Sequence, residues 1–375
     1  MDKNTINVAV IGLGFGQHFA RIFLHHPNVG QLTVVDPDRA RLDSFVRDNP
    51  GVRVLPSFED VLADKSIDAV HVCTPIPIHG QQSIAALRAG KHCACAVPMA
   101  ISKDDIYGIV DAVRETGLNY MMMETQLYGT PFLEARRMRD AGELGVIQHM
   151  RGIHYQPMEN WPGYWDGLPP MFYGTHCIAP LVGMAGCKIK RVFCFGSGTM
   201  AESRRKQYGN PYPVEDALFE FESGLKGEVV RGLFECSALS TESFNIYGSK
   251  RSVYGEYRSS ISEKINVDRR ICYDGFTISE KPCHWPNVYA NLPREIQRFT
   301  ICAPWCDVDD WERFLDSAPA GGHKGSHPRL VHEFVSSILE GRKPYVDEQL
   351  SANITLAGLC AHESAMRGGA LLDVE

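Results

Sequence analysis

A glycine-rich loop between an apolar strand and an amphipathic helix constrains this chain more than any other feature. Residues Ile6 to Ile11 are a short run of branched apolar residues, which is typical of a buried strand. The loop Gly12-Leu13-Gly14-Phe15-Gly16-Gln17 follows directly, and a helical pattern begins after it. Glycine lets the backbone approach a ligand closely, and a helix N-terminus favours a phosphate group. The pattern therefore predicts the first strand, loop and helix of a dinucleotide-binding sheet.

An acidic residue at the end of the second apolar run strengthens this prediction. Asp36 follows the predicted strand Leu32–Val35, where a carboxylate accepts hydrogen bonds from ribose hydroxyls and repels a 2′-phosphate. We therefore predict NAD rather than NADP, although Arg39 and Arg41 lie nearby and weaken the preference. Gln17 stands at the third glycine position of the usual pattern, so we expect looser packing of helix on strand there. The alternative interpretation is a tight turn without a ligand.

The rest of the first 125 residues continues to alternate between strand and helix patterns. Ser57 and Ser102 fit helix N-caps, and Gly90 and Gly117 fit helix ends. The further strands are predicted at Ala69–Cys73, Cys93–Val97 and Tyr120–Met123. Such alternation predicts an α/β fold with a doubly wound parallel sheet. We expect a Rossmann domain over residues 1–125 and a substrate-binding and oligomerisation domain over residues 126–375.

The composition excludes several classes of protein. The net charge is -7, and the densest basic run is Arg204-Arg205-Lys206, so we expect no nucleic-acid partner. No apolar run reaches the length of a membrane span, and the start of the chain lacks the apolar core of a signal peptide. The 12 cysteines lack framework spacing, and the close pairs Cys93/Cys95 and Cys302/Cys306 are not assigned to a metal. We expect a cytoplasmic protein with reduced thiols.

Three further motifs resemble the glucose-fructose oxidoreductase and inositol dehydrogenase family. They are Val72-Cys73-Thr74-Pro75 with His79, the stretch Ala85–His92, and Gly142-Glu143-Leu144-Gly145. The resemblance implies a C-terminal α/β domain with an open, mostly antiparallel sheet that is often used for oligomer contacts. We therefore expect a homo-oligomer.

The second half of the chain fits this layout. Glu222–Leu225 is a plausible hairpin turn, and a helix is predicted near Arg329–Leu339. The candidate strands are Val146–Tyr155, Lys190–Phe195, Ala217–Phe221, Glu228–Glu235, Phe244–Tyr247 and Ser252–Tyr257.

The chain departs from the family's dehydrogenases at two motifs. Dehydrogenases of the family carry Glu-Lys-Pro, whose lysine helps to deprotonate the substrate hydroxyl, where this chain has Ala96-Val97-Pro98. Their Gly-x-His-x-x-Asp motif stands here as Gly174-Thr175-His176-Cys177-Ile178-Ala179, without the aspartate. Neither valine nor alanine can exchange a proton, so an ordinary dehydrogenase mechanism lacks two of its groups.

A glycosidase branch of the family resembles this chain more closely. The stretch Tyr173–Pro180 is similar to the Tyr-Pro-Thr-His-Gly-Leu-Gly-Pro motif of the NAD-dependent α-N-acetylgalactosaminidases. Those enzymes also have Val-Pro where dehydrogenases have Lys-Pro, and their Met-Met-Glu-Asn segment is similar to Met122–Thr125. The NAD-dependent sulfoquinovosidases form a related branch. The resemblance implies a glycosidase that oxidises a sugar at C3, removes the C2 proton, eliminates the C1 leaving group, adds water and returns the hydride.

This reading assigns roles to residues suited to proton transfer, cofactor binding and sugar stacking. The candidate catalytic residues are His176, Tyr173, Glu124 and Tyr128. The candidate cofactor-binding residues are Gly12, Gly14, Phe15, Gly16, Gln17, Asp36, Thr74, Pro75, His79 and Pro98. The candidate substrate-binding residues are Tyr155, Trp161, Trp165 and His327. Each of these side chains also has an ordinary structural interpretation.

Two other functions and several substrates stay open. One alternative is a simple NAD-dependent sugar or polyol dehydrogenase, in which another group replaces the lysine. The other is a non-catalytic regulator that senses the dinucleotide. An anionic sugar such as a sulfoquinovoside would need a cationic partner, and the candidates are Lys188, Lys190, Arg204 and Lys324.

Overall fold

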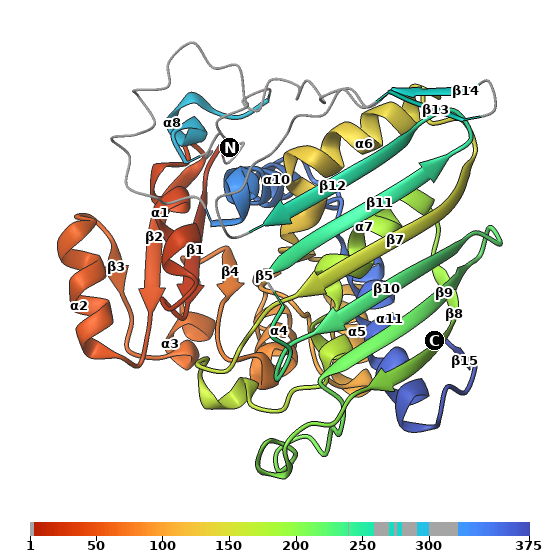
Figure 1. The fold of residues 1–375 in the computed structure, drawn as a ribbon. Helices are drawn as coiled ribbons and strands as arrows, with labels where there is room; N and C mark the ends of the chain where they lie inside the picture. Colours follow the sequence, from red (N-terminus) through yellow and green to blue (C-terminus); the bar gives the residue numbers. More distant parts are fainter. Residues whose placement is uncertain (1–3, 239, 259–269, 274–275, 280–290, 300–321) are drawn as a thin grey trace.

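A computed structural model of the chain describes residues 4–238, 240–258, 270–273, 276–279, 291–299 and 322–375. It contains two large sheets, a smaller one formed by the N-terminal residues and a broader one formed by the C-terminal residues (Figure 1). A separate pair of short strands, β13 (Arg270–Tyr273) and β14 (Phe276–Ser279), forms an antiparallel ladder.

The N-terminal sheet is parallel and has the strand order β3-β2-β1-β4-β5-β6. Its strands are β1 (Ile6–Ile11), β2 (Val29–Val35), β3 (Arg53–Val54), β4 (Ala69–Val72), β5 (His92–Cys95) and β6 (Tyr120–Met122). Its helices are α1 (Gln17–His25), α2 (Arg39–Asp48), α3 (Phe58–Ala63), α4 (His79–Arg88) and α5 (Lys103–Thr116), with the 3-10 helix η1 (Ile76–Ile78) before α4. Strands β2 and β3 are added on one side of β1, and β4 to β6 are added on its other side. The strand order therefore reverses between β1 and β4, which is where dinucleotides bind in such sheets.

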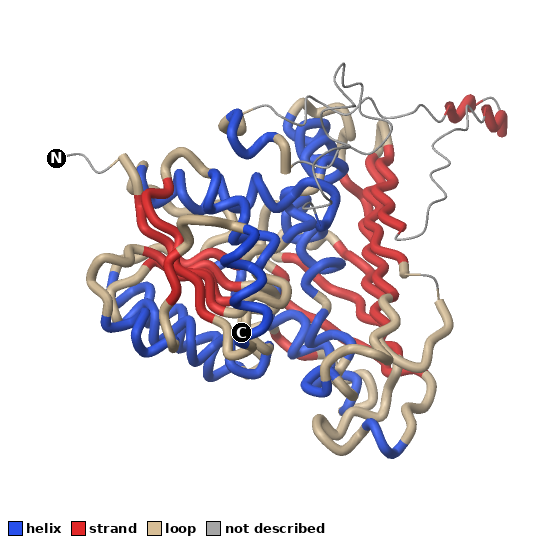
Figure 2. The backbone as a smooth tube through the Cα atoms, turned by 90° about the vertical axis from the view of Figure 1, so that its left-hand side faces the viewer, coloured by secondary structure: helices blue, strands red, loops and turns tan. Residues whose placement is uncertain are grey.

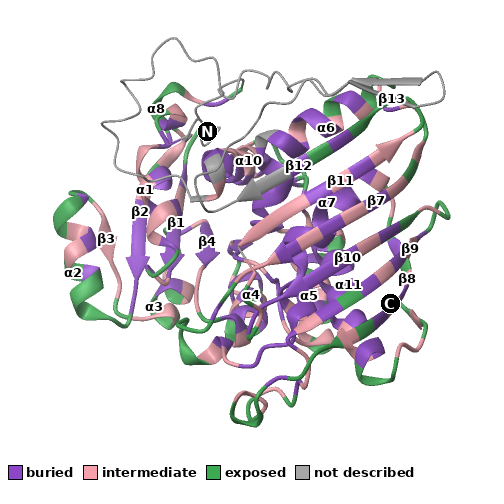
Figure 3. Ribbon diagram, in the orientation of Figure 1, coloured by how far each residue is buried: buried purple, intermediate pink, exposed green. Residues whose placement is uncertain are grey.

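Local signals in the sequence explain these elements. The hydroxyl of Ser57 accepts a hydrogen bond from the backbone N–H of Asp60, and that of Ser102 accepts one from Asp105. Gly117 ends α5 in the left-handed conformation, with φ of 69°. Strands β1 and β4 are buried along almost their whole length, as their apolar runs predict (Figure 3). The predicted doubly wound sheet is confirmed, and β3 is the strand that the sequence did not reveal.

The C-terminal sheet is open, mixed and mostly antiparallel, as predicted. Its order is β12-β11-β7-β10-β9-β8-β15, and β10 with β7 is its parallel pair among the described residues. Its strands are β7 (Ile147–Tyr155), β8 (Ile189–Ser197), β9 (Val214–Phe221), β10 (Lys226–Gly232), β11 (Thr241–Gly248), β12 (Ser252–Arg258) and β15 (Leu372–Asp373). The predicted hairpin turn joins β9 to β10, with Gly224 at φ of 85°.

Helices cover one face of this sheet and leave the other face open (Figure 1). The covering helices are α6 (Thr130–Asp140), α7 (Thr175–Ala185) and α11 (Glu348–Met366). The side view of Figure 2 shows helices between the strands of the two sheets. Helix α11 packs on β8 and also on α5 and β6, so it joins the two sheets.

The remaining elements connect or flank these layers. Helix α10 (Ser326–Leu339) packs on α1, and it begins three residues before the helix predicted near Arg329. The short helices are η2 (Thr125–Tyr128), η3 (Gly163–Trp165), η4 (Pro170–Tyr173), η5 (Glu202–Arg204), α8 (Arg294–Gln297) and η6 (Gly322–Gly325). The predicted domain boundary after residue 125 falls inside η2 and stays a prediction. No helix in the described ranges is both long enough and apolar enough to cross a bilayer.

Candidate active site

The glycine loop leaves room for a dinucleotide at the N-terminus of α1. A Cβ atom on Gly12, whose φ is +90°, would lie 2.6 Å from the carbonyl oxygen of Cys73. A Cβ atom on Gly16 would overlap the carbonyl oxygen of Gly12. By contrast, a Cβ atom on Gly14 would meet nothing within 4 Å. The backbone is therefore open at Gly14, where a pyrophosphate would approach it.

Packing beside this loop differs from the expectation for Gln17. Gly16 itself makes the close approach of helix to strand, because its missing Cβ would meet Val10 and Cys73. The Gln17 amide instead donates a hydrogen bond to the carbonyl oxygen of Gly14 at 3.0 Å. The looser packing predicted from the missing third glycine is therefore not found.

Asp36 is tied to the glycine loop and to one arginine. Its carboxylate accepts hydrogen bonds from the backbone N–H groups of Leu13 at 2.6 Å and Asp38 at 2.8 Å. The guanidinium of Arg41 lies 3.3 and 3.2 Å from the two carboxylate oxygens of Asp36. Arg39 pairs with Asp43 instead, at 3.0 Å. Of the two nearby arginines, Arg41 is the one that touches the acid.

His79 joins the carboxyl ends of β4 and β5. Its ring nitrogens lie 2.8 Å from the carbonyl oxygen of Pro98 and 2.8 Å from that of Thr74. Carbonyl oxygens only accept hydrogen bonds, so both ring nitrogens must carry hydrogen and the ring is an imidazolium. Burial alone would lower the pKa of His79, but Cys95 and the two carbonyl groups raise it to about 9. His79 thus fixes Thr74-Pro75 against Pro98, and Val97 packs on apolar side chains beside it.

Glu124 and His176 form a buried pair at the carboxyl edge of the N-terminal sheet. Glu124 follows β6, and His176 lies in the first turn of α7. The His176 Nδ1 atom lies 2.7 Å from Glu124 Oε1. Burial opposes both charges, but each partner stabilises the other, so the pKa of Glu124 falls and that of His176 rises. The predicted catalytic pair is therefore assembled, and its imidazole is oriented by the carboxylate.

Tyr173 lies between His176 and a buried arginine. The Tyr173 and His176 rings meet edge to face with centroids 5.4 Å apart, and the Arg231 guanidinium carbon lies 5.3 Å from the Tyr173 ring centroid. Arg231 donates hydrogen bonds to the carbonyl oxygens of Tyr173 at 2.9 Å and His154 at 3.0 Å, and to the Gln156 side chain at 3.1 Å. Burial lowers the pKa of Arg231 to about 10 and raises that of Tyr173, which the Arg231 charge counteracts.

Arg231, Glu242 and His154 lie beside the candidate site but were not predicted from the sequence. Glu242 Oε1 lies 3.8 Å from Nδ1 of His176 and 3.9 Å from Nδ1 of His154. All three unpredicted residues lie on strands and point toward the helices, among side chains that are otherwise mostly apolar. A polar residue at an inward position of a strand is the signal that could have revealed them.

A pair of histidines connects His176 with the glycine loop. The His323 ring lies 5.7 Å from that of His176, and its Nδ1 atom lies 3.1 Å from Nε2 of His327. The Phe15 ring meets both edge-on, at centroid distances of 5.8 and 5.6 Å. His327 also packs on Phe19 of α1. Burial lowers the pKa of His323 to about 3 and that of His327 well below its usual value, so both rings are neutral.

The structure places the other predicted substrate and catalytic residues at different distances from this site. Trp165 is buried against Tyr173, with ring centroids 4.8 Å apart, and the half-exposed Trp161 packs edge-on against Trp165. Tyr155 follows His154 on β7 and lies on the opposite face of the strand, against Gly232. The Tyr128 ring faces Tyr345 instead of His176. The roles of these four residues stay predictions.

The cations proposed for an anionic sugar do not contact the Glu124–His176 pair. Lys188 and Lys190 are exposed beside the turn that contains Glu222. Arg204 pairs with Asp166 at 2.5 Å and Glu235 at 3.3 Å. The Lys324 side chain, like Cys302 and Cys306, lies outside what the structure describes. In the described ranges, no group of three or more His, Cys, Asp or Glu side chains is arranged to hold a metal ion.

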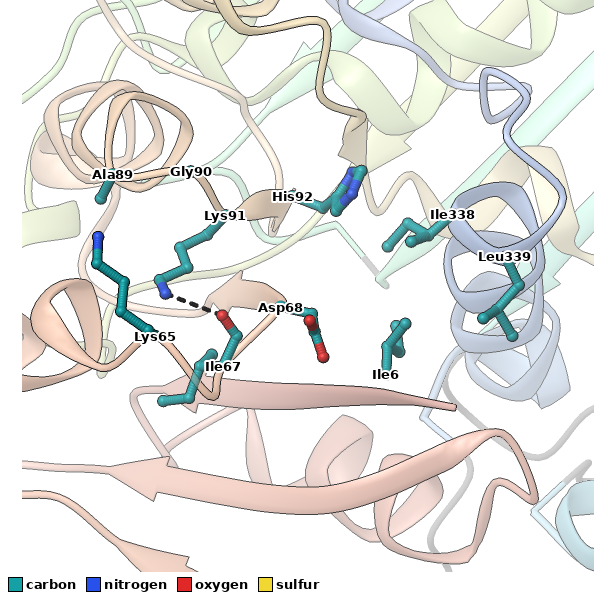
Figure 4. Close-up of a pocket in the computed structure, with 10 residues that line it drawn as sticks. All are labelled: Ile6, Lys65, Ile67, Asp68, Ala89, Gly90, Lys91, His92, Ile338 and Leu339. Carbon is teal, nitrogen blue, oxygen red and sulfur yellow. Dashed lines mark hydrogen bonds between the residues drawn. The ribbon is translucent and has the colours of Figure 1, made fainter. Parts of the chain in front are cut away.

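A cavity of about 530 Å³ lies at the opposite, amino-terminal edge of the parallel sheet (Figure 4). Its lining residues are Ile6, Lys65, Ile67, Asp68, Ala89, Gly90, Lys91, His92, Ile338 and Leu339. The Lys91 ammonium is already bonded to the carbonyl oxygens of Asp64 and Ile67. Because ligands of doubly wound sheets bind at the carboxyl edge, this cavity is separate from the candidate site.

Comparison with known sequences gives the same two-part organisation. Residues 6–124 match the model of an oxidoreductase family with an NAD-binding Rossmann fold. Residues 132–254 match the model of the GFO/IDH/MocA C-terminal domain.

The curated relatives include proteins named glycosyl hydrolase family 109. One from Streptomyces niveus is 23% identical, over 98% of this chain and 76% of that protein. Another from Bacteroides fragilis (strain YCH46) is 28% identical, over 47% of this chain and 42% of that protein.

Solved structures of inositol dehydrogenases share the fold. The scyllo-inositol dehydrogenase from Lactobacillus casei, described with bound NAD(H) and scyllo-inositol, is 19% identical with a TM-score of 0.71, covering 99% of both chains. The myo-inositol 2-dehydrogenase from Lactobacillus plantarum is 17% identical with a TM-score of 0.72, covering 99% of this chain and 100% of that one. The two family models match the two parts of the chain, and the glycine loop and the candidate site at the carboxyl edge agree with them. The chain therefore belongs to the GFO/IDH/MocA oxidoreductase family, and its cofactor is NAD.

Proposed function

We propose that this protein is an NAD-dependent glycosidase that oxidises its sugar transiently and reduces it again within one turnover. The observation that carries the proposal is the Glu124–His176 hydrogen bond of 2.7 Å beside Tyr173, together with valine at position 97. The hydrogen bond beside Tyr173 supports a role in proton transfer. Valine at position 97 stands in place of the lysine on which the family's dehydrogenases depend. The glycosyl hydrolase names of the relatives support the same choice.

The bound cofactor supplies a hydride acceptor and donor. The residues of this chain supply the proton transfers that such a cycle needs. The His176 Nδ1–H group donates to Glu124, which leaves Nε2 without a hydrogen-bond partner among the described residues and makes it the atom that exchanges protons. The Tyr173 phenol is the second acid/base group, because burial keeps its proton in place and the Arg231 charge against its ring partly offsets this effect. These two groups can serve the protons at sugar C2, C3 and the leaving-group oxygen.

We infer that the substrate is an uncharged glycoside. Around the Glu124–His176 pair, Arg231 is the cation that the described residues provide, and its donors are bonded to carbonyl oxygens. Arg204 is held by two carboxylates. A sulfoquinovoside would therefore have to displace existing ion pairs, which disfavours it against a neutral sugar.

Isotope labels test the cycle. The NAD-loaded protein is screened with nitrophenyl glycosides, and an accepted sugar is then prepared with deuterium at C2 or at C3. We expect loss of the C2 label to water and retention of the C3 label, read by mass spectrometry of the product. Stoichiometric NADH in solution with an oxidised product would establish the simple dehydrogenase instead. NAD binding without turnover of any glycoside or polyol would favour the regulator.

We also propose a homo-oligomer in the cytoplasm. The support for assembly is the open face of the C-terminal sheet, where Phe195 is 55% exposed and Tyr254 is 64% exposed. Light scattering after size exclusion tests the assembly, because a monomer mass would contradict it.

A further inference from the structure

Glu242 occupies an inward position of β11 that the fold alone does not explain. In the antiparallel register, Glu242 lies opposite His154, Phe244 opposite Gly152 and Ile246 opposite Met150. Phe244 and Ile246 on this face are buried apolar residues. A carboxyl group among them costs free energy unless it interacts with something. Glu242 is therefore an exception on a face that otherwise builds the core.

The Gln126 side chain bonds to the Glu242 carboxyl, but one of the two carboxyl oxygens gains no hydrogen bond that would offset this cost. The Oε1 atom of Glu242 is inaccessible and has no hydrogen-bond partner in the described part of the chain, and the same holds for Nδ1 of His154. Both atoms lie near His176, because Glu242 Oε1 is 3.8 Å from its Nδ1 atom and the His154 ring is 5.5 Å from its ring. Buried unpaired polar atoms of this kind call for a functional explanation.

Two carboxyl groups thus approach one nitrogen of one imidazole. The Nδ1–H group can be donated to one oxygen, and the distance of 2.7 Å assigns it to Glu124. Glu242 at 3.8 Å therefore acts on His176 through its charge and not through a hydrogen bond. The other titratable or charged groups around His176 are Tyr173, Cys177, Arg231, His154 and His323.

The two carboxyl groups differ in how strongly each holds its proton. Burial alone would raise the pKa of Glu124, but His176 and the hydrogen bonds to the carboxylate lower it, so Glu124 loses its proton more readily than Glu242. Burial holds the pKa of Glu242 up, and the neighbouring Glu124 charge adds to this, against the effect of His176. Pairs of groups whose environments move their pKa values apart are characteristic of acid/base sites.

We propose that Glu242 is a positioning residue that determines how tightly His176 holds its proton, while Glu124 orients the imidazole. The inference rests on the proposed function in one respect, namely that His176 is the acid/base group. When Glu242 is protonated, a negative charge near His176 is lost, and the proton affinity of His176 therefore falls. The two groups therefore titrate as a coupled pair.

Histidine NMR of the NAD-loaded protein tests the coupling without any substrate. The protein carries ¹³C- and ¹⁵N-labelled histidine, and the spectrum of His176→Gln assigns the His176 signal. We expect Glu242→Gln to lower the pKa of His176 by about one unit, because it removes an opposite charge within 4 Å. Glu242→Asp keeps the negative charge, so the pKa of His176 in this variant should lie between those of the parent and Glu242→Gln. Glu228→Gln, on β10 and paired with Arg151 at 3.2 Å, is the matched control and should leave His176 unchanged.

A reciprocal measurement covers the case in which Glu242→Gln does not fold. By linkage, removing His176 must alter the titration of Glu242 as much as removing Glu242 alters that of His176. We expect ¹³C-glutamate spectra of His176→Gln to show a raised pKa for Glu242. Identical His176 titration in the parent and Glu242→Gln, or an unchanged Glu242 titration in His176→Gln, would overturn the proposal.

Kinetics separate the failure of this inference from the failure of the proposed function. With an accepted glycoside, Glu242→Gln should move the His176-dependent limb of the kcat/KM pH profile by the same amount as the NMR shift. Coupling in the NMR spectra with no glycoside turnover would reject the glycosidase and keep the role of Glu242. If glycosides are turned over but Glu242→Gln changes neither the kcat/KM pH profile nor the NMR titration of His176, the glycosidase proposal stands and the role of Glu242 is rejected.

Discussion

The guanidinium of Arg231 lies against the ring of Tyr173 and is bonded to the backbone carbonyl of the same residue. The carbon-to-centroid distance is 5.3 Å, and the hydrogen bond measures 2.9 Å. One buried side chain therefore fixes the position of Tyr173 and places a positive charge beside its phenol.

Replacing Arg231 should affect both stability and the Tyr173 phenol. Arg231→Met leaves the carbonyl oxygens of Tyr173, His154 and Gly232 without this donor, so we expect a loss of roughly 3 kcal/mol or more in the free energy of unfolding. The pKa of Tyr173 should rise further, because the charge that counteracts burial is gone. Urea denaturation and ultraviolet titration of the phenol measure the two effects. A fully stable Arg231→Met with an unchanged phenol would contradict this reading, and Arg231→Lys is the charge-preserving control.

Replacing His176 should abolish turnover and spare cofactor binding. His176→Ala removes the proton-exchanging nitrogen, and loss of a general acid/base lowers the rate by roughly 10²–10⁴-fold. NAD binds at the glycine loop, so its dissociation constant should stay close to that of the parent. Steady-state rates and fluorescence titration with NADH provide the two readouts. Near-normal turnover would reduce His176 to a structural residue.

Asp36 and Arg41 together should set the preference between NAD and NADP. Asp36→Ala removes the ribose acceptor and releases Arg41 from the contacts of 3.2 and 3.3 Å. We expect weaker NAD binding and stronger NADP binding, each by roughly tenfold, because a free guanidinium can pair with a 2′-phosphate. The double variant with Arg41→Ala should lose the gain in NADP affinity. If Asp36→Ala binds both cofactors as the parent does, Asp36 is not the ribose ligand.

Buried neutral histidines should make the protein sensitive to acid. Burial lowers the pKa of His71 to about 3 and that of His26 to about 4, below the usual value of 6.5. The unfolded chain takes up these protons first, so stability is complete above pH 6.5 and falls as the pH drops toward the folded values. Each histidine contributes about 1.4 kcal/mol per pH unit in that window. Urea denaturation at several pH values should show a shallower decline for His71→Leu. An equal slope in parent and variant would mean that His71 is not buried in the neutral form.

His79 should produce the opposite dependence on the alkaline side. Its pKa is raised to about 9, so its contribution is complete below pH 6.5 and is lost as the pH rises through 9. His79→Gln keeps a donor for the Pro98 or Thr74 carbonyl but cannot titrate, so its stability should change less between neutral and alkaline pH. Thermal unfolding over this range measures the difference, with His92→Gln as a control. A parent protein whose stability is flat across the range would exclude the buried imidazolium.

The sequence was sufficient for the local structure of the parallel sheet. Runs such as Ile6–Ile11 and caps such as Ser57 act within a few residues, so they are readable without tertiary information. The strand β3 escaped because Arg53–Val54 is two residues long and half-buried, too short for a periodic pattern. Glu124, Tyr173 and His176 were found through motif resemblance, and the structure brings them together.

The rest of the site depends on strand pairing, which a single sequence does not specify. The sequence pattern predicts Tyr155 as a site residue and gives no sign of His154. Neighbouring strand residues point to opposite faces, and in the structure His154 faces His176. Glu242 reaches the site because the register sets it opposite His154. Arg231 stood inside a run that predicted a strand, with nothing nearby to show that its partners were the carbonyl groups of Tyr173 and His154.

The contact of Phe15 with the histidine pair links the glycine loop to the surroundings of His176. Phe15 belongs to the loop that must accommodate the pyrophosphate, and its ring edge meets His323, the neighbour of His176. We expect a dinucleotide that moves Phe15 to move His323 as well, and any coupling between cofactor affinity and substrate affinity that results must be equal in both directions. Substrate affinity measured on the protein without its dinucleotide would then describe a different binding surface.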